Sequence, residues 1–277
     1  MERVAVRGAT LEYEILGAGE PVLLIHGVLV ADGLRPLVEQ EGLAAHHQLI
    51  LYHRRGVAGS DGIPSPYTTE EQAADARALL GELGIERAHL AGHSYGAGIA
   101  LQLAADAPDL VHTVASLESA FLLVPSAEQV ALSMEPVGQR FASGDKDGAV
   151  DDFLTAMGGA GYREALDRLL PGAFEQAVED SQTFFTVEFP AVNEWGFDAE
   201  DATRIEAPVL RVLSERSIPW FVESEALLGE WLPNSERSIV SGSGHFLQME
   251  DPAPVADSLA TFYGRHPMGR SPSLPAN

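Results

Sequence analysis

Ser94 lies at the centre of GHSYG, residues 92–96, between an apolar run and a Gly- and Ala-rich helical pattern. A Gly-x-Ser-x-Gly turn between a strand and a helix is typical of a nucleophile elbow. The turn leaves almost no room two residues before and after the serine, where the chain has Gly92 and Gly96. Tight packing of a helix on a sheet would also favour small residues, but it gives no reason for the serine. We therefore expect Ser94 to be an exposed nucleophile.

His245 is the expected general base. It follows an apolar strand pattern and a Gly-Ser-Gly loop, and a helical pattern comes after it. A loop at the carboxyl edge of a sheet lets a histidine reach the serine Oγ. His26 lies too far upstream for this role, and we expect it to hold its own loop by hydrogen bonds. His53 is expected to organise a second loop together with Arg54 or Arg55.

Backbone N–H groups near Ser94 are predicted to form an oxyanion hole. Tyr95 follows the serine and opens a helix, whose N-terminus favours negative charge. The second donor of an elbow comes from the loop after the first parallel strand, which reads HGVLV here. We expect the N–H of Val28 to be this donor and Gly27 to border the substrate.

These residues require a frame, and alternating strand and helix patterns supply it. The alternation favours an α/β fold with a mostly parallel twisted sheet flanked by helices. Expected strands cover 3–8, 10–16, 21–27, 47–56, 87–94, 111–119, 208–215 and 235–242. Expected helices of the core cover 69–84, 96–108, 221–232 and 251–266.

Residues 119–203 interrupt the alternation with helical patterns over 126–142, 147–159 and 162–185. A helical insertion between two strands is expected as a lid over the strand ends. Its aromatic residues include Phe189 and Trp195, which we expect at the substrate, although a lid also buries aromatic residues against its core. The predicted organisation is a core at 1–118 and 204–266, a lid or cap at 119–203 and a disordered tail at 267–277.

Together these motifs resemble the α/β-hydrolase superfamily. The resemblance extends over most of the chain, through HG at 26–27, HRRGVAGSDG at 53–62, GHSYG at 92–96, PVLRVLSERS at 208–217 and GSGHFLQMEDP at 242–252. It implies an α/β-hydrolase fold whose lid is inserted after the strand that ends near Glu118. It also implies a catalytic triad of serine, acid and histidine.

The usual triad acid is missing from this chain. Most of the superfamily has an Asp after the strand written PVLRVL here, but that position holds Ser217. Three interpretations stay open: Glu215 acts from a shifted loop, the triad is broken, or Glu118 acts from the neighbouring strand. Haloalkane dehalogenases and zearalenone-type lactonases of this superfamily carry a glutamate at that strand end, and the spacing of 24 residues from Ser94 is similar. We favour Glu118, because a carboxylate buried at the end of an apolar strand needs a partner.

A triad of Ser94, Glu118 and His245 predicts hydrolysis of a carboxylic ester or lactone through an acyl-enzyme. Dehalogenase chemistry is disfavoured, since it uses an Asp nucleophile and an Asn where this chain has Val28. The expected substrate is small and apolar or aromatic, and no metal or organic cofactor is required. Hydrolysis of a C–C bond in a diketone-type substrate, cofactor-free oxygenation and a non-enzymatic small-molecule receptor remain alternatives.

The composition restricts the partners. The formal net charge of the 277 residues is −24, which repels nucleic-acid phosphates and anionic membranes. The chain contains no cysteine, which excludes disulfides and thiolate metal sites. Neither a signal-peptide pattern nor a long apolar run is evident. We expect a cytoplasmic enzyme acting on a small molecule, without nucleic-acid or membrane partners, and a homodimer is one option for its assembly.

Overall fold

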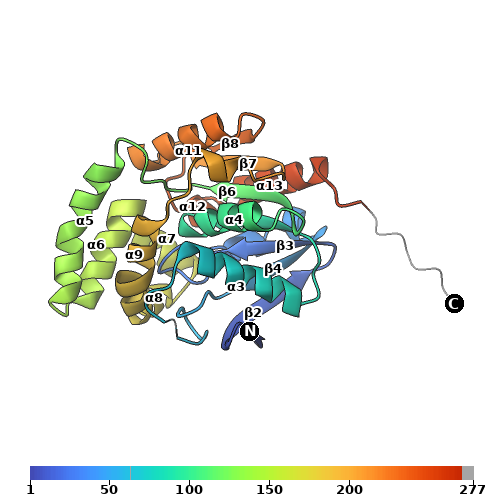
Figure 1. Cartoon of the computed structure of the whole chain (residues 1–277). Coiled ribbons are helices and arrows are strands. Elements are labelled where there is room, and N and C mark those ends of the chain that lie inside the picture. The colour runs from blue at the N-terminus through green and yellow to red at the C-terminus, as the bar shows by residue number, and fades with distance from the viewer. Residues whose placement is uncertain (63, 270–277) are drawn as a thin grey trace.

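An eight-stranded sheet forms the centre of the computed structural model, which describes residues 1–62 and 64–269 (Figure 1). The strands are β1 (Glu2–Val6), β2 (Ala9–Gly17), β3 (Glu20–Ile25), β4 (His47–Tyr52), β5 (Ala88–His93), β6 (Val111–Leu117), β7 (Val209–Ser214) and β8 (Glu236–Val240). Their order across the sheet is β1-β2-β4-β3-β5-β6-β7-β8. The two pairs that involve β2 are antiparallel and the others are parallel. The predicted mostly parallel sheet is confirmed.

Helices cover both faces of this sheet, so its central strands are buried on both sides. The helices on one face are α3 (Thr69–Glu82), α4 (Tyr95–Asp106), α10 (Ala199–Ala202) and α11 (Pro219–Trp231). Those on the other face are α1 (Arg35–Val38), α2 (Glu41–Ala44), α12 (Leu247–Glu250) and α13 (Pro252–Arg265). The longer helices α3, α4, α11 and α13 correspond to the four core helices expected from the sequence, while the short ones had no clear pattern.

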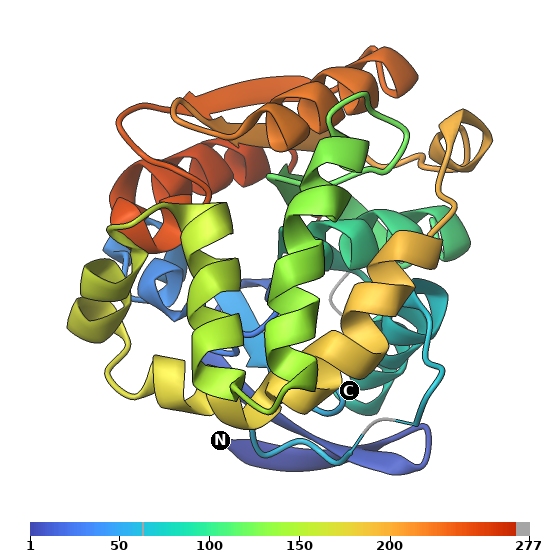
Figure 2. The same cartoon turned by 90° about the vertical axis from the view of Figure 1, so that its left-hand side faces the viewer.

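Most of the segment between β6 and β7, through residue 194, is helical and gathers at one end of the sheet (Figures 1 and 2). It contains α5 (Ala127–Ala142), α6 (Lys146–Gly158), α7 (Tyr162–Leu169), α8 (Ala173–Thr183), a π-helical turn η1 (Phe184–Glu188) and α9 (Phe189–Glu194). Figure 2 shows α5 and α6 side by side at the front of this lid. Its apolar residues form a separate core that also includes Leu29 and Phe246 from the loops beneath it.

The single helix expected over 162–185 is wrong. Gly172 has a φ of +86° and ends the pattern, so that α7 and α8 are separate helices. Pro171 precedes it and has no N–H to continue the helix. Beyond α8 the helical path continues past residue 185 through η1, because Phe184 and its neighbours adopt the wider π turn.

The end of the described chain follows α13. Residues 267–269 form neither helix nor strand, and the rest of the predicted disordered tail, 270–277, lies outside the described residues. Within the described chain, no helix combines the length and apolarity needed to span a membrane.

Candidate active site

Ser94 stands at a strained turn between β5 and α4. Its φ is +55° and its ψ is −120°, values that a residue other than glycine rarely adopts. A Cβ added at Gly92 would lie 2.1 Å from Gly96 O, and one added at Gly96 would lie 2.0 Å from Ile25 O. The turn therefore exists only with glycine at both positions, as the elbow interpretation requires.

Glu118 follows β6 directly and is 1% exposed. Its Oε2 accepts a hydrogen bond of 2.9 Å from His245 Nδ1. Three further donors surround the carboxylate: Ser214 N at 2.7 Å, Ser214 Oγ at 2.6 Å and Ser217 Oγ at 3.0 Å. Burial opposes ionisation, but the bonds and charge from His245 and the bonds from Ser214 outweigh it and lower the pKa of Glu118. The ionised carboxylate holds the proton on His245 Nδ1 and leaves Nε2 free to accept one.

Ser217 and Ser214 are site residues that sequence reasoning missed. Ser217 occupies the position of the absent Asp, and its hydroxyl donates to Glu118 instead of supplying a charge. Glu215, the other candidate acid, is exposed, and its Oε2 accepts from Gly242 N at 2.8 Å. This arrangement favours Glu118 over Glu215 as the partner of His245. The available signal was the pair of serines on either side of Glu215 and Arg216, but it becomes meaningful only once Glu118 is known to face them.

His245 is held on two sides. Its ring stacks on Phe221, with ring centres 4.0 Å apart and planes 5° apart. Its backbone carbonyl accepts a hydrogen bond of 2.9 Å from His93 Nε2, and Gln248 Nε2 donates to His93 Nδ1 at 3.2 Å. Burial, together with the nearby His245, lowers the pKa of His93 to about 3. A neutral His93 therefore ties the loop of His245 to the elbow of Ser94.

Ser94 and His245 border the same hollow, which Gly27 and Val28 also line. The hydrogen bonds of the described residues include none between Ser94 and His245, and such bonds are commonly long before substrate binds. Tyr95 is the first residue of α4, so its N–H has no partner within the helix. Val28 and Tyr95, the two expected oxyanion donors, both line the cavity that Ser94 borders.

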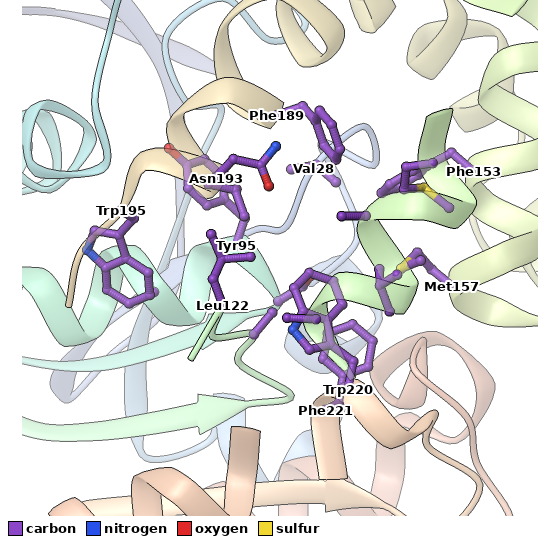
Figure 3. A pocket seen from close by; sticks show the side chains of 18 of the residues that line it. Val28, Tyr95, Leu122, Phe153, Met157, Phe189, Asn193, Trp195, Trp220 and Phe221 are labelled. Atoms are coloured by element: carbon purple, nitrogen blue, oxygen red, sulfur yellow. The ribbon is translucent and has the colours of Figure 1, made fainter. Parts of the chain in front are cut away.

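An apolar cavity, partly open to solvent, extends from Ser94 beneath the lid (Figure 3). Phe189 and Trp195, both expected at the substrate, line it. The indole nitrogen of Trp195 is engaged outside the cavity by Gln102 Oε1 at 2.9 Å. Asn193, which sequence reasoning missed, also lines the cavity and carries a polar side chain at its rim. The remaining lining is largely aliphatic and aromatic, including Val28, Met134, Phe153, Met157, Phe184 and Phe221.

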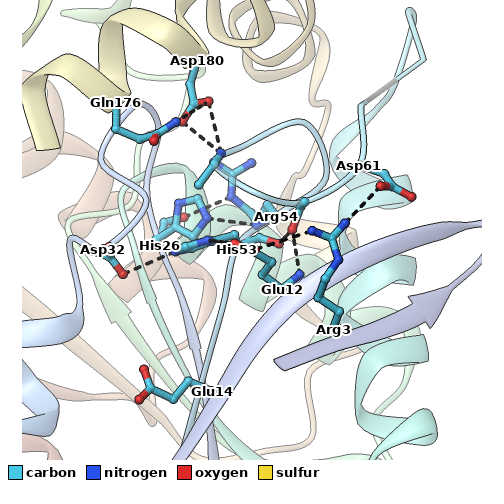
Figure 4. Close-up of polar contacts among 12 residues, drawn as sticks. Arg3, Glu12, Glu14, His26, Asp32, His53, Arg54, Asp61, Gln176 and Asp180 are labelled. Carbon is cyan, nitrogen blue, oxygen red and sulfur yellow. Dashed lines mark hydrogen bonds and ion pairs between the residues drawn. The ribbon is translucent and has the colours of Figure 1, made fainter. Parts of the chain in front are cut away.

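His53 follows β4 and contacts carboxylates (Figure 4). Its Nδ1 is 3.1 Å from Glu12 Oε2 and its Nε2 is 3.3 Å from Asp32 Oδ1. Burial opposes its charge, but both carboxylates outweigh burial and raise the pKa of His53, while the bond to His53 lowers the pKa of Asp32 to about 2. The expected cooperation with Arg54 or Arg55 is not a direct contact, because each arginine pairs with another acid.

No group of three or more His, Asp or Glu side chains within residues 1–62 and 64–269 is arranged to hold a metal ion.

Comparisons with known proteins agree with this architecture. The family described as alpha/beta hydrolase fold matches residues 20–252. A Pseudomonas savastanoi pv. phaseolicola protein named "Putative carbamate hydrolase RutD" is 25% identical over 262 residues, 88% of this chain and 94% of that protein. Its namesake from Azorhizobium caulinodans is 42% identical over 107 residues, which are 38% of this chain and only 40% of the relative. The crystal structure of the enol-lactonase from Burkholderia xenovorans LB400 superposes with a TM-score of 0.81 at 20% identity, over 95% of this chain and all of that one.

Proposed function

Because the chain belongs to the α/β-hydrolase family, we propose that it is a serine hydrolase that cleaves a carboxylic ester or lactone. One observation carries this proposal. His245 Nδ1 is paired at 2.9 Å with the buried Glu118, and His245 borders the same hollow as the strained Ser94. An oriented imidazole that shares a hollow with a half-buried serine hydroxyl is the arrangement that acyl transfer requires.

The reaction proceeds through two displacements. Ser94 Oγ attacks the carbonyl carbon while His245 Nε2 takes its proton, and the carboxylate of Glu118 stabilises the imidazolium. The N–H groups of Val28 and Tyr95 stabilise the oxyanion. The bond to the leaving oxygen breaks as His245 returns the proton to it. Water, deprotonated by the same histidine, then attacks the acyl-enzyme and releases the acid and Ser94.

The cavity supports an apolar or aromatic substrate. The free polar side chains along it are few: Ser94 at its base and Asn193 at its rim, since the indole nitrogens of Trp195 and Trp220 are both hydrogen-bonded to other groups. Burial of apolar substrate groups there would supply most of the binding energy. The relatives named for carbamate hydrolysis suggest a second acyl substrate, since a carbamate ester is cleaved by the same steps.

A substrate panel with two proteins tests the proposal. Wild type and Ser94→Ala are assayed with p-nitrophenyl acetate, butyrate and octanoate, an aromatic lactone, an aryl carbamate and a diketone. We expect ester or lactone turnover that falls by at least about 10³-fold in Ser94→Ala. If only the diketone is turned over, the proposed activity is wrong and the protein hydrolyses a C–C bond. If wild type binds a ligand tightly without turning it over, the proposed hydrolysis is wrong and the protein is a receptor.

A further inference from the structure

Arg54 is a buried charge that the steps above do not use. It is 0% exposed and precedes Arg55 in the loop after β4. Its guanidinium forms an ion pair with Glu188, which is 1% exposed and belongs to the π-helical turn η1 of the lid. Two buried ions are costly to desolvate, and apolar residues of similar size often serve stability equally well. Stability alone therefore does not explain why Arg54 and Glu188 are buried as an ion pair.

The remaining hydrogen bonds of Arg54 lead to the oxyanion loop. Its Nη2 donates to Gly27 O at 2.8 Å and its Nε donates to His26 O at 3.3 Å. Its backbone N–H also donates to His26 Nε2 at 3.1 Å, which makes His26 Nδ1 the donor to Gly27 O at 2.7 Å (Figure 4). Gly27 O thus accepts two hydrogen bonds, one of them from a cation.

Those two bonds fix the direction of the Val28 N–H. The carbonyl of Gly27 and the N–H of Val28 belong to one peptide unit, and in a planar trans peptide they point in opposite directions. Holding the oxygen on the side of Arg54 therefore aims the N–H away from Arg54. Hydrogen bonds to the oxygen also polarise the peptide and strengthen its N–H as a donor.

Arg54 contacts the second oxyanion residue as well. Its guanidinium carbon lies 5.0 Å from the centre of the Tyr95 ring, within the range of a cation–π contact. Both backbone donors beside Ser94 therefore belong to segments that pack on the same cation. The carboxylate that balances this cation comes from the lid, in the same turn as Phe184, which lines the substrate cavity.

We propose that Arg54 and Glu188 form a positioning pair that points the Val28 N–H at the oxyanion. Because Glu188 belongs to the lid, the pair also couples the direction of this N–H to the position of the lid. The inference rests on the proposed function, because it assigns Val28 to the oxyanion hole of an acyl transfer. Neither residue touches the reacting atoms. Their effect is expected on the transition state more than on the bound substrate.

A double variant, Arg54→Met with Glu188→Leu, tests the pair without leaving an unpaired charge. We expect kcat on a p-nitrophenyl ester to fall by about 10- to 100-fold, less than the loss of a whole oxyanion donor, since His26 still holds Gly27 O. KM stays within about twofold, and the Ki of an alkylboronic acid, which places an oxygen anion in the hole, rises by the same factor as kcat falls.

The neighbouring pair provides a control that also removes a buried ion pair, in which Asp75 accepts further hydrogen bonds from Arg7 and Tyr67. Arg55 and Asp75 are also buried partners, joined at 2.8 and 3.0 Å, and Arg55 makes no hydrogen bond to Gly27 among the described contacts. In Arg55→Met with Asp75→Leu, we expect kcat and the boronic acid Ki within about threefold of wild type. Equal losses of kcat in both double variants would overturn the proposal.

A conservative variant covers the case in which the double variant does not fold. Arg54→Lys keeps the charge opposite Glu188, but one ammonium nitrogen replaces the three guanidinium nitrogens that separately bond Glu188, Gly27 O and His26 O, so the planar fork is lost. We expect a thermal midpoint near that of wild type and a fall in kcat with a matching rise in the boronic acid Ki. A folded Arg54→Lys protein with unchanged kcat and Ki would refute the pair. Absence of Ser94-dependent turnover in wild type would instead refute the proposed function.

Discussion

Ser217 Oγ donates a hydrogen bond of 3.0 Å to Oε2 of Glu118, the same oxygen that His245 Nδ1 contacts at 2.9 Å. Ser217 stands where most members of the superfamily resembled by the sequence carry their acid. The position therefore still adjoins the carboxylate that pairs with the histidine, but it contributes a hydrogen-bond donor in place of a charge. Glu118 supplies the carboxylate from the end of the neighbouring strand β6.

Neutralising Glu118 is expected to remove most of the activity. Glu118→Gln keeps the size of the side chain but places an amide beside His245 Nδ1, which no longer favours the tautomer with a free Nε2. We expect kcat to fall by about 10³- to 10⁴-fold, as the loss of an orienting acid does elsewhere. Glu215→Gln, measured beside it with the same ester, should keep full activity, because Glu215 is exposed and binds Gly242 N. The reverse outcome would make Glu215 the acid.

Moving the acid should restore part of the lost activity. In Glu118→Gln with Ser217→Asp, a carboxylate replaces the Ser217 hydroxyl, which contacts the same Glu118 oxygen as His245 Nδ1. We expect kcat at least about tenfold above that of Glu118→Gln alone, since a negative charge again faces Nδ1. Ser217→Asn on the same background has the same shape without the charge. Equal rescue by Asn and Asp would show that packing, not charge, causes the recovery.

Low pH should destabilise the protein through His89. This residue lies in β5, at the opposite end of the strand from Ser94. Burial, with His112 and His47 nearby, lowers the pKa of His89 to about 3. The unfolded chain takes up this proton near pH 6.5 and the folded chain does not, so stability is lost as the pH falls below about 6.5. One such histidine costs about 2 kcal/mol between pH 8 and pH 5.

Urea unfolding of wild type and His89→Gln at both pH values measures this contribution. We expect the variant to lose less stability between pH 8 and pH 5 than wild type does. The remaining loss includes the contribution of His93, whose pKa is also lowered to about 3. An identical pH dependence in the two proteins would mean that His89 takes up its proton equally well in the folded state.

Asp180 predicts the opposite pH dependence at the contact between α8 and the core. Its carboxylate oxygens both lie 3.1 Å from Ala58 N (Figure 4), while burial, with a contribution from Glu188, raises its pKa to about 6. The folded state therefore holds this proton more tightly than the unfolded state, and stability falls as the pH rises from about 4 to above 6.

Asp180→Asn retains an oxygen that accepts from Ala58 N and removes the charge. We expect a thermal midpoint about 2–4 °C above wild type at pH 8, corresponding to about 1 kcal/mol after screening by solvent, and a smaller difference at pH 4.5. A lower midpoint at pH 8 would show that the charge on Asp180 strengthens the contact with the loop at Ala58.

Local patterns were sufficient to predict the frame and the tight turn at Ser94. The alternation of strands and helices and the glycines around Ser94 are short-range signals, and each has a direct steric or packing cause. Pro171 and Gly172 are a signal for the end of a helix. The helical periodicity on both sides nevertheless led to the prediction of one continuous helix. The same periodicity gave no sign of the π turn at Phe184–Glu188.

Contacts between distant segments could not be predicted in this way. Ser217 is 99 residues from Glu118, and Arg54 is 134 residues from Glu188, so no local spacing relates either pair. Glu118 itself could be identified from the sequence, because a carboxylate at the end of a buried apolar strand needs a partner. Its donors emerged only when β6 and β7 were placed side by side.

Trapping the acyl-enzyme tests the central claim most directly. Wild type, Ser94→Ala and Glu118→Gln are mixed with p-nitrophenyl octanoate, quenched in acid within milliseconds to seconds and analysed by peptide mass spectrometry. We predict an octanoyl group on the peptide that contains Ser94 in wild type, its absence in Ser94→Ala and much slower acylation in Glu118→Gln. Acylation of another residue, or full turnover by Ser94→Ala, would contradict the account.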